Sequence, residues 1–119
     1  MTEEKILETA VKALDSKKAE DICVIRISDK TIIGDYFVIA NGTSSTHTKA
    51  LADEVEYQLG EAGVKPKQVS GANGSNWIVL DYSDVIVHVF SKDMREFYNL
   101  ERLWRDGENI DISKWVKPN

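Results

Sequence analysis

The residues that offer chemistry most directly are the turn from Gly42 to Ser45 and the acidic side chains Asp81 and Asp84. The turn stands between an apolar run and a helical pattern, where free backbone N–H groups can hold a phosphate. Two carboxylates that converge can hold a pair of divalent cations about 4 Å apart. Together these residues raise the hypothesis of metal-assisted chemistry on a nucleotide.

A nucleotidyltransferase is the enzyme class that combines a Gly-Ser turn before a helix with paired acids on a later strand. The pattern here is a weak match, because the turn lacks the Gly-Lys-Thr ending of a phosphate loop and is not GxGxxG. Ser and Thr in the turn are ordinary helix-capping residues. Asp81 and Asp84 flank a hairpin turn instead of alternating along one strand face, as turn-forming acids do. The sequence therefore favours a helix cap and a hairpin turn over an active site.

The histidines give no stronger sign of catalysis. His88 lies within an apolar strand pattern, which favours a structural histidine over a general base. His47 opens a helix and is placed to contact its own turn. No Ser-His-Asp or Cys-His set can be assembled from the spacing, and the single cysteine, Cys23, excludes an internal disulfide and a zinc finger. The sequence thus predicts no catalytic residue, no metal site and no cofactor, with Cys23 as a buried, inert thiol.

The elements that position these residues follow from hydrophobic periodicity. Helices are predicted at 3–15, 45–62 and 93–104, and strands at 22–27, 35–40, 77–82 and 84–91, with turns at 28–30 and 71–76. Thr2 is the expected cap of the first helix, and Gly63 is the expected left-handed residue after the second. The last two strands form an antiparallel hairpin. The order of elements predicts one α/β domain, with a mixed sheet and helices packed on it.

Side-chain alternation predicts which residues enter the core. The apolar run from Tyr36 to Ala40 indicates a central strand buried on both faces. In the last strand Val85, Val87 and Val89 point one way, while Ile86, His88 and Phe90 point the other. The expected helical core positions are Ile6, Leu7, Ala10, Val11, Leu14, Leu51, Val55 and Leu59.

Aromatic residues exceed what one core needs. Trp77 and Tyr82 have opposite parity on one strand, so both cannot face the helices. Phe97, Tyr98 and Trp104 nearly surround the last predicted helix. These rings fit a second helix layer or a dimer seam, and they equally fit the anchors of a protein interface.

Composition limits the class of partner. The 119 residues are 42% hydrophobic and 29% charged, as in ordinary globular domains, and the net charge is −5. An acidic chain is a poor general binder of nucleic acid and is attracted to basic partners. No run approaches the roughly 18 apolar residues of a membrane span, and the charged N-terminus has no secretory pattern. A cytoplasmic protein without membrane or free nucleic-acid partners is expected.

Three separated blocks resemble the ribosomal silencing factor family, also called Iojap-like. The first runs from Asp35 to Ser45 and continues with His47 and residues 49–54. The second holds Gly74, Trp77 and residues 80–82 and 84–90, and the third is 95–104. The blocks occur in order and cover roughly residues 4–106. The domain is expected at 1–107, and residues 108–119, which lie outside the matching blocks, are expected to form a C-terminal tail that either packs back on the sheet or crosses to a partner subunit.

The resemblance also implies a mixed α/β domain similar to the nucleotidyltransferase fold but without a working active site. Members of the family bind the large ribosomal subunit at its protein uL14, block joining of the small subunit, and lower translation when nutrients are scarce. They also tend to form homodimers. Candidate contacts with the ribosomal protein, placed on the exposed sheet surface and the adjoining helix, are Trp77, Asp81, His88, Arg95, Tyr98 and Glu101.

The leading hypothesis from the sequence is a non-enzymatic translational repressor. Two alternatives stay open at this point. One is the nucleotidyltransferase built on Gly42–Ser45, Asp81 and Asp84, and the other is a dimerisation module without ribosome affinity.

Overall fold

The computed structural model describes residues 2–26, 36–71, 76–92 and 108–117. In chain order the elements are α1 (Glu3–Ser16), β1 (Glu20–Arg26), β2 (Tyr36–Gly42), α2 (Ser45–Glu61), β3 (Gln68–Ser70), β4 (Trp77–Asp81), β5 (Val85–Ser91) and β6 (Glu108–Ile110). The predicted helix at 93–104 and the turn at 28–30 lie outside the described residues. Neither described helix is long and apolar enough to cross a membrane.

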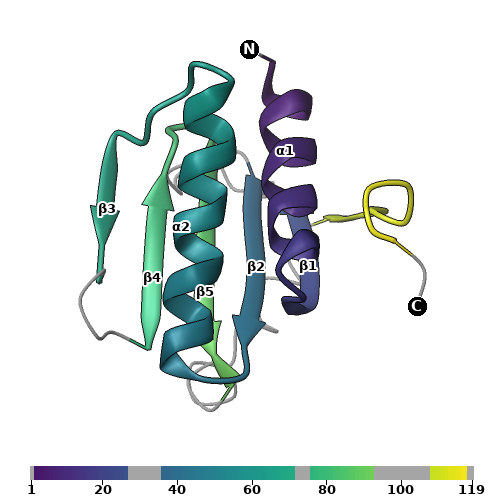
Figure 1. Cartoon of the computed structure of the whole chain (residues 1–119). Helices are drawn as coiled ribbons and strands as arrows, with labels where there is room; N and C mark the ends of the chain where they lie inside the picture. Colours follow the sequence, from purple (N-terminus) through teal and green to yellow (C-terminus); the bar gives the residue numbers. More distant parts are fainter. Residues whose placement is uncertain (1, 27–35, 72–75, 93–107, 118–119) are drawn as a thin grey trace.

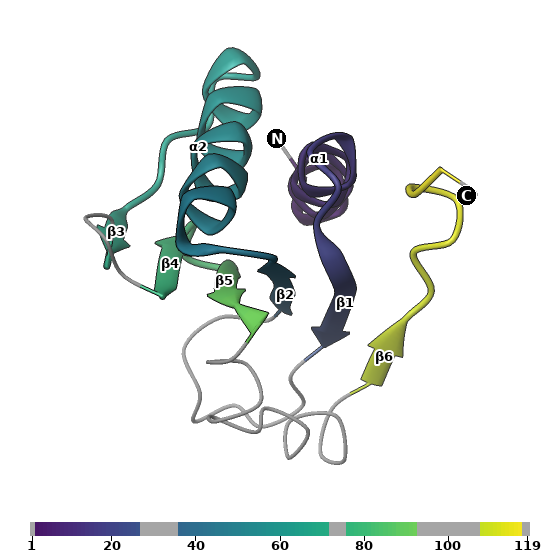
Figure 2. The same ribbon diagram turned by 60° about the horizontal axis from the view of Figure 1, so that its bottom comes forward.

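The strands form one mixed sheet in the order β3-β4-β5-β2-β1-β6. β2 and β5 pair in parallel at its centre, and the other neighbours pair antiparallel. Figure 2 shows α1 and α2 on the same side of this sheet. Among the described residues the opposite face carries no helix, and it is called the helix-free face below. The predicted α/β architecture and the β4–β5 hairpin are confirmed.

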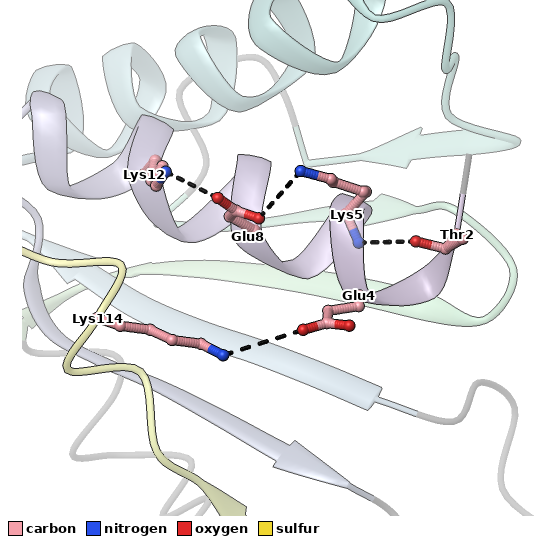
Figure 3. A network of polar contacts seen from close by, with 6 residues as sticks. All are labelled: Thr2, Glu4, Lys5, Glu8, Lys12 and Lys114. Carbon is pink, nitrogen blue, oxygen red and sulfur yellow. Dashed lines mark hydrogen bonds and ion pairs between the residues drawn. The ribbon is translucent and has the colours of Figure 1, made fainter.

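The N-terminal helix α1 forms where its apolar stripe and its cap predict it. The Thr2 side chain accepts a hydrogen bond from the backbone N–H of Lys5 at 3.2 Å, as an N-cap does. On the outer surface Glu8 contacts Lys12 at 2.7 Å and Lys5 at 3.6 Å (Figure 3). The hydrogen bond from Lys12 lowers the pKa of Glu8. The buried stripe of the helix consists of Ile6, Leu7, Ala10, Val11, Ala13 and Leu14.

The second helix α2 follows the Gly42–Ser45 turn and lies beside α1 on the sheet (Figure 1). Leu51, Val55 and Leu59 are fully buried, as predicted. Gly63 adopts φ 86°, a left-handed conformation that glycine reaches without steric cost, and this confirms the predicted end of the helix.

Alternation along the central strands sorts their side chains between the two faces. Val85, Val87 and Val89 join the core under the helices, while Phe90 joins a second cluster on the helix-free face with Ile25 and Ile39. Val38 and Ile39 are both fully buried although they point to opposite faces. The prediction of a central strand buried on both sides is therefore confirmed.

The structure adds two short edge strands, β3 and β6, that the sequence pattern does not predict. The segment expected as a C-terminal tail begins with β6, which pairs with β1 through Arg26–Glu108, Ile25–Asn109 and Val24–Ile110. Its Trp115 is only 8% exposed and belongs to the main core cluster. Of the two placements left open by the sequence, the structure shows packing on the chain's own sheet.

One core prediction is wrong in part. Cys23 is only partly buried, although the apolar run around it suggested full burial. It lies on the helix-free face, next to a break in the β1–β2 register between Glu20 and Cys23. This irregular pairing leaves the strand less evenly covered than its apolar sequence implies.

Candidate functional site

The predicted contact residues that the structure describes lie on the helix-free face of the hairpin. In β4, Ile78 and Leu80 enter the core under the helices, so Trp77 and Asp81 point the other way. His88 of β5 lies on the same face and is buried, with 8% exposure. Arg95, Tyr98 and Glu101, the remaining predicted contacts, fall outside the described residues.

Trp77 is held by two aromatic neighbours on β5. Its ring stacks on Phe90 with centroids 5.1 Å apart and planes 21° from parallel. Its indole Nε1–H donates a hydrogen bond to Nδ1 of His88 at 3.2 Å. Phe37 of β2 packs on the other side of the histidine at 4.7 Å. Trp77 is therefore partly exposed and has a fixed orientation, and its contacts with His88 and Phe90 connect it to the central strand β5.

The hydrogen bond from Trp77 sets the protonation state of His88. An indole nitrogen can only donate, so Nδ1 of His88 is the acceptor and the imidazole proton is assigned to Nε2. That Nε2 is buried and has no hydrogen-bond partner among the described residues. Burial lowers the pKa of His88 to about 4, so the ring is neutral at pH 7.

A measurable pH dependence follows from this burial. The unfolded chain takes up the His88 proton near pH 6.5, whereas the folded chain takes it up only near pH 4. Between these values the unfolded state binds more protons, so stability falls as the pH is lowered, by up to about 3 kcal/mol. Urea unfolding of wild type and His88→Phe from pH 7 to pH 4 measures this difference. If the free energy of unfolding changed equally with pH in the two proteins, the assigned effect of His88 would be contradicted.

Asp81 has a structural role in the β4–β5 turn. Its Oδ1 accepts a hydrogen bond from the backbone N–H of Ser83 at 2.8 Å, and Ser83 adopts φ 73°. The Tyr82 N–H donates to the Val85 carbonyl across the turn at 2.9 Å. Asp81 is thus a turn former of the kind that the sequence favoured. It still lies on the same face as Trp77, as the predicted contact surface requires.

The Gly42–Ser45 turn is a closed helix cap. The Ser44 side chain accepts from the His47 N–H at 3.1 Å, and Nδ1 of His47 accepts from the Thr43 N–H at 2.9 Å. A Cβ at Gly42 would stand 2.8 Å from the backbone nitrogen of Thr48, so the turn requires glycine here. The N–H groups of Thr43 and His47, which a phosphate at this turn would use, are therefore bonded within the protein.

The turn and the acidic pair lie at opposite ends of the sheet (Figure 1). In the parallel β2–β5 pair, Gly42 is opposite Ser91, whereas Asp84 precedes Val85, the partner of Tyr36. Six residue steps of a strand separate the two ends by about 20 Å. Within the described part of the chain, no three His, Cys, Asp or Glu side chains meet as a metal ion requires. The structure does not bring together the parts of a nucleotidyltransferase site.

The helix cap predicts a clean effect on stability. Ser44→Ala removes the oxygen that accepts from the His47 N–H and is expected to lower the free energy of unfolding by about 1 kcal/mol. Ser45→Ala, one residue along in the exposed first turn, is the matched control and is expected to change stability little. Urea denaturation compares the two variants, and equal stability would contradict the assigned cap.

Sequence reasoning missed one link that depends on tertiary structure. His47 contacts its own turn, as expected, but its Nε2 also lies 2.7 Å from the carbonyl oxygen of Lys17. With Nδ1 accepting from Thr43, Nε2 is the donor in this contact. The bond ties the start of α2 to the end of α1, and local spacing gives no sign of a partner 30 residues away.

Comparisons with known proteins show to which sequences the chain is similar. The family described as "Ribosomal silencing factor during starvation" matches residues 1–119. A Bacillus subtilis protein named Ribosomal silencing factor RsfS is 39% identical over 112 residues, covering 94% of this chain and 95% of that protein. A mouse protein named Mitochondrial assembly of ribosomal large subunit protein 1 is 31% identical, covering 82% of this chain and 44% of that protein.

Solved structures agree as well. A crystal structure of a Chromobacterium violaceum protein matches with a TM-score of 0.83 and 32% sequence identity, covering 100% of this chain and 92% of that chain. The match over the whole length and the curated relatives together show that the chain belongs to the ribosomal silencing factor family.

Proposed function

We propose that the chain binds the large ribosomal subunit at its protein uL14, on the face that meets the small subunit. By occupying that face it keeps the subunits apart, and translation falls when nutrients are limited. Membership of the family supports the coarser part, since a ribosomal silencing factor represses translation on the ribosome. The name of the mouse relative, which refers to assembly of the ribosomal large subunit, supports the choice of subunit. The proposal places the chain in the cytoplasm, where subunits join.

The single observation that carries the proposal is the orientation of Trp77 on the helix-free face. Tryptophan is enriched among the residues that dominate binding energy, and such anchors lose less conformational entropy when they are already ordered. Trp77 is partly exposed, stacked on Phe90 and hydrogen-bonded to His88. This is the state that an interface anchor needs before it meets its partner.

The charge of the chain supports a basic protein as the contact. Twenty acidic residues stand against fifteen Lys and Arg, giving a net charge of −5. Such a chain is repelled by phosphate groups and attracted to a basic ribosomal protein, which accelerates the correct encounter. Asp81 places a carboxylate on the face that carries Trp77.

Steric block requires no catalytic group. A standard interface buries about 800 Å² on each partner, which is roughly a tenth of the surface of a small protein. The remaining bulk of the domain then stands where the second subunit would dock. Under this proposal neither the Gly42–Ser45 turn nor Asp81 needs a catalytic role.

Binding to purified components tests the proposal. Large subunits, small subunits and isolated uL14 are each incubated with the chain, and co-sedimentation or pull-down measures binding. The expected result is binding to large subunits and to uL14, weakened by salt, and none to small subunits. Binding to large subunits but not to uL14 would overturn the assigned contact protein. Absence of binding to large subunits would overturn the proposed function itself.

A further inference from the structure

We propose that His88 is a positioning residue, which accepts the indole N–H of Trp77 and thereby holds that ring in the orientation in which it meets the partner. The inference rests on the proposed function and deepens it. It assigns to His88 an action through Trp77, since the histidine is only 8% exposed and offers the partner little surface of its own.

The geometry fixes the tryptophan from two directions. Stacking on Phe90 at 5.1 Å sets the plane of the indole ring. The 3.2 Å hydrogen bond to Nδ1 of His88 sets its rotation within that plane, because only one edge of the ring carries the N–H. In the β4–β5 register Trp77 is opposite Phe90 and Val79 is opposite His88, so the bond crosses the hairpin diagonally.

This bond also determines what the partner can recognise. The N–H is the only polar group of a tryptophan side chain, and here it is used within the protein. The partner therefore meets Trp77 as a ring surface and not as a hydrogen-bond donor. Aliphatic stems and the cations of Arg or Lys are the groups that such a surface attracts. A basic protein that presents those side chains fits both the ring and the net charge of −5.

Stability alone does not explain a histidine at this position. Among the described residues its ring neighbours are Phe37, Phe90 and Trp77, and an apolar ring would fill the same space without a polar atom. Instead, Nε2 is buried without a hydrogen-bond partner among the described residues. A buried donor left in that state destabilises the fold, because it has lost its hydrogen bonds to water without replacement. A buried residue that lowers stability is expected where it contributes to function. The contribution that the structure shows for His88 is its hydrogen bond to Trp77.

Three substitutions at His88 distinguish the role of Nδ1 from that of Nε2. The amide oxygen of Asn lies near the place of Nδ1, so His88→Asn keeps an acceptor for Trp77. The amide of Gln reaches the place of Nε2, so His88→Gln removes the Nδ1 acceptor while retaining a polar group. His88→Phe removes both and keeps the ring. Asn leaves space in the core, whereas Phe removes a buried polar atom. The free energy of unfolding is therefore expected to be highest for His88→Phe, intermediate for wild type and lowest for His88→Asn.

Binding is expected in a different order. His88→Phe and His88→Gln should bind large subunits up to about tenfold more weakly than wild type, because a Trp77 ring that is no longer held must be ordered when it binds. His88→Asn should bind within about threefold of wild type despite its lower stability. If His88 were merely structural, all the folded variants would instead bind large subunits as tightly as wild type.

Nitrogen NMR of the free protein supplies a readout that is independent of the ribosome. The spectrum of wild type should show His88 protonated on Nε2 at pH 7, and a Trp77 indole N–H resonance that shifts in His88→Phe but much less in His88→Asn. A Trp77→Phe variant assigns that resonance. Protonation on Nδ1, or His88→Phe binding as tightly as wild type, would overturn the positioning role while leaving the proposed function standing. If wild type itself fails to bind large subunits, the proposed function fails and the positioning role fails with it.

Discussion

Replacement of Trp77 by Ala is expected to weaken binding to the large ribosomal subunit by about 30-fold or more, the loss typical of a central interface anchor. The substitution removes the ring that Phe90 and His88 hold in place, which is the proposed anchor of the helix-free face. Co-sedimentation with large subunits at increasing concentrations of the variant measures the affinity. Because Trp77 is partly buried, the same samples are checked for folding by circular dichroism.

The matched control is Tyr57→Ala. Tyr57 is also a large aromatic residue and is 60% exposed, but it lies on α2, on the helix-covered side of the molecule. Its loss should leave binding to large subunits within about twofold, since substitution of an exposed residue away from the contact face does little. If Trp77→Ala binds like wild type, or if Tyr57→Ala is the damaging variant, the helix-free face is not the contact surface.

Replacement of Trp115 by Ala should lower the free energy of unfolding by about 3 kcal/mol, within the range observed for removal of a buried aromatic ring. Trp115 is 8% exposed and packs into the main core. It also lines a cavity with Leu7 of α1 and Tyr36 of β2, far from it in sequence. Urea denaturation measures the loss, which would show that the C-terminal segment is part of the folded domain.

Lys114→Ala is the neighbouring control. The Lys114 ammonium lies 4.0 Å from Glu4 (Figure 3) and 5.5 Å from the Trp115 ring centroid, with both charged side chains mostly exposed. Exposed pairs of this kind contribute less than about 1 kcal/mol. A Trp115→Ala protein as stable as Lys114→Ala would mean that the segment does not pack on the core in solution.

The sequence predicts those elements whose signals are local. The apolar stripes of α1 and α2, the cap at Thr2, a capping Ser or Thr in the Gly42–Ser45 turn, and the end of α2 at Gly63 are each signalled within a few residues, and all are confirmed. The structure identifies Ser44 as the capping residue of α2. β3 and β6 were missed because each is three residues long and mostly polar. A short edge strand is defined by its partner, and the partner of β6 is β1, about eighty residues earlier.

The same distinction applies to the candidate site. Alternation placed His88 and Phe90 on one face of β5, and parity separated Trp77 from Tyr82. The hydrogen bond between Trp77 and His88 additionally requires the register of the hairpin, which depends on the backbone of the Tyr82–Asp84 turn. One residue of slip would remove it. The fixed orientation of Trp77 is therefore visible only in three dimensions.

Subunit joining is the most direct test of the central claim. Purified large subunits are incubated with the chain before small subunits are added, and sedimentation then measures how many joined ribosomes form. The account predicts that joining falls in proportion to the large subunits occupied by the chain. It also predicts that Trp77→Ala restores joining and that Tyr57→Ala blocks it like wild type. Normal joining with wild-type protein bound to every large subunit would contradict the account.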